Sequence, residues 1–117
     1  MSLSDWSESI VIVELADEPA FSEDMDALSR RLEEASGATP DVIVNVGRVT
    51  YMNSSNIAQL LKVRKKLLDD GGRLRLCAMN DQVWSLMLAT GLDSVFDFTD
   101  DVATSLASLQ IRPENGG

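Results

Sequence analysis

Residues 41–77, DVIVNVGRVTYMNSSNIAQLLKVRKKLLDDGGRLRLC, contain the three segments that decide the fold. Residues 42–46 are almost entirely apolar and β-branched, as in a strand that helices cover on both faces. A helix is predicted to begin near Ser54 and to end at the glycine pair 71–72. Residues 73–79 alternate between polar and apolar side chains, which predicts a further strand. This order of strand, helix and strand is typical of parallel pairing.

The same alternation extends along the rest of the chain. We expect further strands at residues 9–16 and 94–99. We expect a helix from Ser22 to Gly37, a helix over residues 80–90 and a last helix through Leu109. The predicted fold class is therefore α/β, with a mixed, largely parallel sheet of four to five strands flanked by about four helices. Residues 42–46 should form a central strand.

The predicted domain spans residues 9–110. A polar lead-in precedes it at residues 1–8, and a loose tail follows at residues 111–117. Its two middle helices carry apolar stripes. The stripe of the first comprises Ile57, Leu60, Leu61, Arg64 and Leu68, and that of the second comprises Val83, Trp84, Met87 and Leu88. We expect the second stripe to be core. Any of its apolar residues left exposed would instead favour a partner site.

The composition excludes several classes of function. The chain has 117 residues and a net charge of −9, and such a charge repels nucleic acid and anionic lipid. Its sequence contains no apolar run long enough to cross a membrane, so we expect no membrane insertion. A single cysteine, Cys77, is expected to be a small buried hydrophobe and fits a cytoplasmic location. Histidine is absent, and we see no metal-ligand spacing or phosphate-binding loop. We therefore expect no cofactor, no metal and no enzymatic activity.

The motif NSSN, residues 53–56, stands where the central helix begins. Asparagine and serine are preferred at helix N-caps, because a side-chain oxygen accepts a hydrogen bond from a free amide of the first turn. Loss of such a cap costs about 1 kcal/mol, and capping alone would explain the motif.

The wider context resembles a STAS domain, in particular the single-domain bacterial anti-sigma-factor antagonists. That family follows a strand with the pattern D-L-S-x-V-x-x-M-D-S-S-G-L, and NVGRVTYMNSSNIAQLL corresponds to it here. The segment GGRLRLCAM corresponds to the family's next strand, and VWSLMLATGLDSVFDF to the helix and strand that follow. The resemblance covers residues 9–109 in order and spacing.

This resemblance implies a non-catalytic regulatory module that binds a serine-kinase-like anti-sigma factor. The kinase would phosphorylate Ser54 and bind the unphosphorylated form. We expect Ser54 to be accessible and Ser55 to be the less exposed serine. The candidate partner-binding residues are Met52, Asn53, Ser55, Asn56 and Gln59. The chain is expected to be a monomer or a weak homodimer.

Two positions depart from the family pattern. Asn53 stands where the family has aspartate, and Asn56 stands where it has glycine. These departures support an alternative, in which an unphosphorylated STAS subunit binds a transporter ATPase or a signalling scaffold protein.

Overall fold

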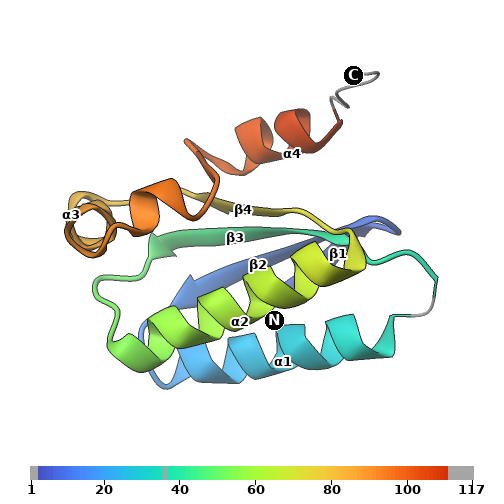
Figure 1. Cartoon of the computed structure of the whole chain (residues 1–117), viewed down its shortest axis with the longest axis horizontal. Helices are drawn as coiled ribbons and strands as arrows, with labels where there is room; N and C mark the ends of the chain where they lie inside the picture. The colour runs from blue at the N-terminus through green and yellow to red at the C-terminus, as the bar shows by residue number, and fades with distance from the viewer. Residues whose placement is uncertain (1–2, 36, 111–117) are drawn as a thin grey trace.

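The computed structural model describes residues 3–35 and 37–110. It is an α/β fold built on one five-stranded sheet with the strand order β1-β2-β3-β4-β5 (Figure 1). The strands are β1 (Leu3–Ser7), β2 (Ile10–Ala16), β3 (Asp41–Arg48), β4 (Leu74–Cys77) and β5 (Phe98–Thr99). The helices are α1 (Ala20–Glu34), α2 (Ser54–Asp70), α3 (Asp81–Thr90), the short 3-10 helix η1 (Leu92–Ser94) and α4 (Val102–Gln110).

Strand β3 lies at the centre of the sheet. It pairs in parallel with β2 on one side and with β4 on the other. Val42, Ile43, Val44 and Val46 are fully buried, which confirms the prediction for residues 42–46. Burial on both faces explains why this strand lacks the alternation of a half-exposed strand.

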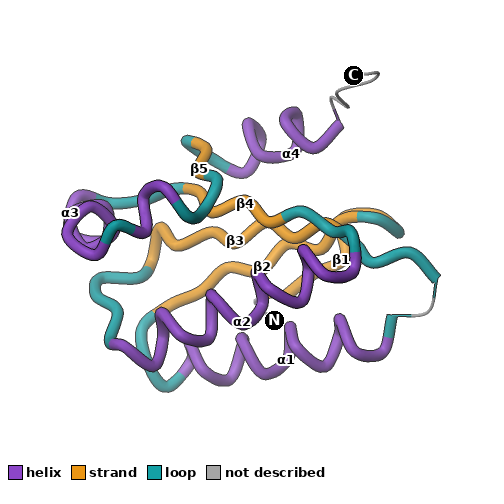
Figure 2. The backbone as a smooth tube through the Cα atoms, viewed as in Figure 1, coloured by secondary structure: helices purple, strands orange, loops and turns teal. Residues whose placement is uncertain are grey.

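The helices cover the two faces of the sheet unequally (Figure 2). One face carries the larger core, to which α1, α2 and α3 contribute Leu28, Leu60 and Met87. On the opposite face, Ile43 and Cys77 pack against Leu109 of α4. Cys77 is buried as predicted.

The amino-terminal residues and the first helix differ from the prediction. Residues 3–7, which we expected to belong to a polar lead-in, form β1 and pair antiparallel with β2. Helix α1 begins at Ala20 instead of Ser22. The reason is that Glu18 Oε1 accepts a hydrogen bond from Ser22 N, so a side chain before the helix caps its first turn. The predicted tail at residues 111–117 lies outside the described residues.

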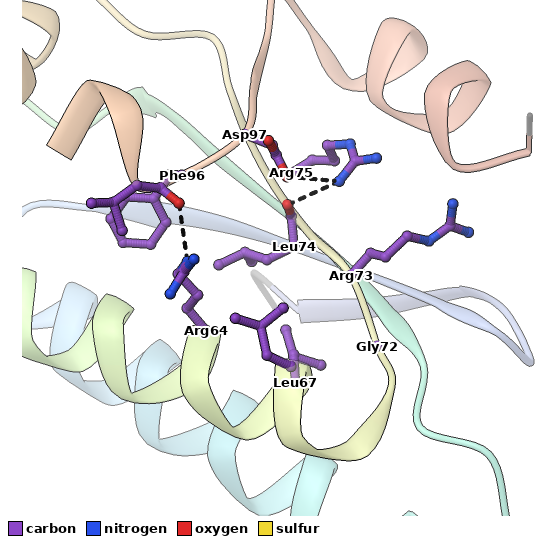
Figure 3. A pocket seen from close by; sticks show the side chains of 10 residues that line it. Arg64, Leu67, Gly72, Arg73, Leu74, Arg75, Phe96 and Asp97 are labelled. Atoms are coloured by element: carbon purple, nitrogen blue, oxygen red, sulfur yellow. Dashed lines mark hydrogen bonds and ion pairs between the residues drawn. The ribbon is translucent and has the colours of Figure 1, made fainter. Parts of the chain in front are cut away.

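Strand β5 is much shorter than the predicted strand at residues 94–99, because Ser94 belongs to η1 and pairing with β4 begins only at Phe98. In the segment before β5, two arginines hold backbone carbonyl groups (Figure 3). Arg64 Nε donates to Val95 O at 3.0 Å, and Arg75 Nη1 donates to Leu74 O at 3.3 Å. The gap that remains beside β4 is a cavity of about 80 Å³. Parallel pairing resumes at Leu76↔Phe98.

The buried stripe of α2 is also rotated from the one predicted, and that of α3 is narrower. On α2 the buried side chains are Asn56, Leu60, Val63 and Leu67, whereas Leu61 and Leu68 are exposed. On α3 the buried side chains are Val83 and Met87, whereas Trp84 and Leu88 are partly exposed. Each exposed residue follows a buried one and therefore lies about 100° further around its helix. The expectation that Trp84 and Leu88 belong to the core was wrong.

Candidate functional site

One edge of the sheet gathers most of the polar residues singled out by the sequence. Strands β2 to β5 run parallel, so their carboxyl ends meet at this edge. We call it the carboxyl edge and define it as residues 17–18, 49–56, 78–81 and 99–101. In open α/β sheets, ligands commonly bind outside the carboxyl ends of the strands.

The start of α2 is fixed by a reciprocal pair of side-chain hydrogen bonds. Asn53 is the N-cap, and its Oδ1 accepts a hydrogen bond from Asn56 N at 2.8 Å. Asn56 Oδ1 accepts in return from Asn53 N at 3.1 Å. This is a capping box in which Asn56 takes the place usually held by Glu or Gln. Ser54 is the first residue of the helix and does not serve as its cap.

The side chain of Asn56 also belongs to a polar network that joins the starts of α1 and α2. Asn56 is only 1% exposed, and its Nδ2 donates to Glu18 Oε2 at 2.9 Å. Glu18 Oε2 also accepts from the hydroxyl of Ser22 at 2.6 Å. Gln59 Nε2 donates to that same hydroxyl at 3.2 Å. The loop after β2 and the first turn of α2 are therefore tied to each other.

Two carboxylates of this edge are held in the charged form. The hydroxyl and the amide of Ser22, and then the side-chain amide of Asn56, lower the pKa of Glu18 by donating to its carboxylate. The hydroxyl and the amide of Thr50 likewise lower the pKa of Asp17. The carboxyl edge is thus negatively charged beside the start of α2 at neutral pH.

The predicted partner-binding residues divide into two groups. Asn53, Ser54 and Ser55 are exposed at the carboxyl edge, and Gln59 is half-buried. Met52 and Asn56 are buried beneath this surface. Both serines are exposed, as expected for Ser54. Among the described residues, neither serine hydroxyl has a hydrogen-bond partner.

The sequence analysis did not identify Glu18 and Ser22 as site residues. A signal for them was present, because a carboxylate that precedes a proline and stands four residues before a serine suits the start of a helix. The link from Glu18 to Asn56 spans 38 positions and has no local signature.

Residues 3–35 and 37–110 contain no cluster of three or more side chains suited to hold a metal ion. In the same residues, no helix combines the length and the apolar character needed to cross a bilayer.

Solved structures share this fold at low sequence identity. An anti-sigma-factor antagonist (STAS) domain protein from Planctomyces limnophilus matches with a TM-score of 0.78 and 15% identity, covering 93% of this chain and 97% of its own. The anti-sigma factor antagonist SpoIIAA in its unphosphorylated form matches with a TM-score of 0.69 and 18% identity, covering 91% and 93%. A sulfate transporter family protein from Wolinella succinogenes matches with a TM-score of 0.71 and 19% identity, covering 85% and 83%.

The sequence itself identifies the family. The profile of the STAS domain matches residues 6–105, which is most of the chain and includes the whole carboxyl edge. The chain therefore belongs to the STAS domain family.

Proposed function

We propose that this protein is a non-catalytic regulatory module of the anti-sigma-factor antagonist type. It binds a serine-kinase-like anti-sigma factor through the exposed start of α2, and phosphorylation of Ser54 by that kinase releases it. Asn53, Ser54 and Ser55 form the contact surface. Gln59 takes part from its half-buried position, while Met52 and Asn56 act beneath the surface by fixing its shape.

The observation that supports this proposal is the position of Ser54. Its side chain is exposed at the first position of a 17-residue helix, and the cap is supplied by Asn53 instead. The hydroxyl of Ser54 is therefore available to a kinase without loss of the cap.

The electrostatics of this position suit a reversible switch. A phosphate adds about −1.5 to −2 charges at neutral pH. The dipole of α2 and its free amino-terminal amides favour that charge, so the domain stays folded. The carboxylates of Asp17 and Glu18 already make the carboxyl edge negative. An added phosphate makes it more so, and a partner that tolerates the unmodified surface meets added repulsion.

The test uses the full chain and the serine-kinase-like ATPase that co-purifies with it from its own host. Incubation with ATP should add one phosphate by intact mass to the parent and to Ser55→Ala, but not to Ser54→Ala. Ser54→Asp should remain folded and bind the kinase at least tenfold more weakly. Phosphate on Ser54→Ala, or unchanged affinity of Ser54→Asp, would contradict the proposal.

A second candidate is a STAS subunit that is never phosphorylated and that binds a transporter ATPase or a scaffold protein. It is favoured by Asn53, which lacks the charge of the family's aspartate, and by Asn56, which is buried where the family has glycine. The shared fold of a sulfate transporter family protein agrees with it. Co-purification of a transporter ATPase, together with no phosphate on Ser54 in protein from the native host, would support this candidate.

A further inference from the structure

The carboxyl edge holds a second feature beyond the start of α2. A cavity of about 300 Å³ lies between the end of the sheet and the first turns of α3. Its lining residues are Met79, Asp81, Trp84, Phe98, Thr99 and Asp100, and we call it the α3 cavity. Three of its six lining residues are apolar or aromatic, two are acidic and one is a threonine.

We propose that the α3 cavity receives an arginine or lysine side chain of the partner protein. This inference rests on the proposed function, because it requires a protein partner at the carboxyl edge. It adds a recognition element that does not involve Ser54.

The aromatic walls favour a cation over a neutral group. The rings of Trp84 and Phe98 meet edge to face, with centroids 5.1 Å apart and an interplanar angle of 87°. Trp84 remains 37% exposed, so its indole is not fully covered by the protein. A guanidinium or ammonium group that approaches an exposed aromatic face is attracted by the negative charge of the ring face.

The charges of the cavity are complementary to the same ligand. Asp81 and Asp100 are both exposed. Within the described residues, neither carboxylate pairs with a cation or accepts a side-chain hydrogen bond. The lining contains no basic residue. A cationic side chain would gain two carboxylate partners without displacing an ion pair that already exists in the protein.

The surface next to the cavity suits a protein segment better than a free cation. Leu88 lies one helical turn beyond Trp84, on the same side of α3, and is 52% exposed. Large apolar side chains left exposed beside a cavity are typical of protein–protein contacts. A partner segment that inserts a cation could cover Leu88 with a neighbouring apolar residue.

The α3 cavity is also connected to the start of α2. Asn80, the N-cap of α3, donates from Nδ2 to Val49 O at 2.5 Å, in the loop that leads to Ser54. Asp81 and Ser54 thus belong to segments that are fixed to each other. One partner can contact both, with a cation in the cavity and a separate surface over Ser54.

The binding test uses N-acetyl-arginine amide as a probe, in the Trp6→Phe background, where Trp84 is the sole tryptophan and can be excited selectively. The probe is titrated at constant ionic strength against N-acetyl-citrulline amide, which has a similar shape but no charge. We expect saturable binding of the arginine probe and none of the citrulline probe.

Asp81→Asn and Asp100→Asn should each weaken binding of the arginine probe at least threefold, whereas Asp26→Asn, an exposed change on α1, should leave it unaltered. Equal response to both probes, or unchanged binding in Asp81→Asn and Asp100→Asn, would overturn the proposal.

A second titration identifies the source of the cation. The peptide acetyl-Leu-Arg-Leu-amide should bind more tightly than N-acetyl-arginine amide. Leu88→Ser should remove this gain in affinity. If N-acetyl-arginine amide binds as tightly as the peptide, the cavity serves a small cation and the assignment to a protein partner is wrong. The arginine probe should bind Ser54→Asp as it binds the parent. The experiments therefore distinguish an error in the proposed phosphorylation switch from an error in the proposed binding of a cation in the α3 cavity.

Discussion

The carboxylate of Glu18 accepts a hydrogen bond from the buried side-chain amide of Asn56 at 2.9 Å, which joins the start of α1 to the start of α2. Asn56 also forms half of the capping box of α2. The residue that replaces the family's glycine is therefore a structural link, and its loss should alter both helix starts.

Replacement of Asn56 by glycine should destabilise the protein. Asn56→Gly removes the capping partner of Asn53 and leaves Glu18 without one of its donors, so the free energy of unfolding should fall by about 1–3 kcal/mol. Urea unfolding of the parent and the variant measures the change. The matched control is Ser55→Gly, in the same turn but exposed, which should cost at most about 1 kcal/mol. Equal losses in the two variants would show that the Asn56 side chain does not stabilise the fold.

The Glu18 network should make stability depend on pH in a defined direction. The folded state lowers the pKa of Glu18 below its ordinary value of 4.5. The stabilisation is therefore present above the ordinary pKa and is lost as the pH falls through the folded-state pKa. The difference in unfolding free energy between the parent and Glu18→Gln should be largest near pH 7 and should shrink in acid. Urea unfolding at about pH 6.5 and about pH 3.5 measures it.

Glu23→Gln is the control for that experiment, because it changes the net charge equally and Glu23 lies outside the network. Its difference from the parent should vary less with pH. If the two variants depend on pH alike, the effect reflects overall charge and not the contacts of Glu18.

Loss of the Asn53 side chain should lower the unfolding free energy more than loss of the Ser54 hydroxyl. Asn53→Ala should lower the unfolding free energy by about 1 kcal/mol, because Asn53 Oδ1 is the acceptor for Asn56 N. Ser54→Ala should cost less than half as much. Thermal or urea unfolding of both variants tests this ranking. A larger loss for Ser54→Ala would mean that Ser54 acts as the cap.

Cys77 should be inert in the native protein. The side chain is buried, and burial raises the pKa of its thiol, so little reactive thiolate is exposed to reagents. A colourimetric disulfide reagent at about pH 8 should label the native protein slowly and the urea-unfolded protein at once. Rapid native labelling would show that α4 opens readily over this face of the sheet.

Local sequence signals were sufficient wherever one segment determines its own structure. The apolar run of β3 predicted a central buried strand, and burial on both faces confirms it. Helices α2 and α3 begin after asparagine caps and end at Gly71 and Gly91, both in the left-handed region that suits glycine.

The predictions failed where distant segments decide the outcome. The strand predicted at residues 94–99 starts late because its first residue belongs to η1, and the following Val95 carbonyl accepts a bond from Arg64, 31 positions away. Leu61 and Leu88 are exposed, each one position beyond a buried residue, although both fit an apolar stripe. For the candidate site, the exposure of Ser54 was expected from the family resemblance together with a helix start at this motif. Burial of Asn56 depends on Glu18, which no local pattern links to it.

The bonds of Arg64 and Arg75 beside β4 also affect how the protein behaves at high concentration. A sheet edge with free carbonyl and amide groups can recruit a strand from another molecule and start aggregation. At this edge the Leu74 carbonyl is already occupied by Arg75, and Arg64 holds the neighbouring Val95 carbonyl. At this short stretch of β4, the Leu74 carbonyl is therefore not free to accept a hydrogen bond from an incoming strand.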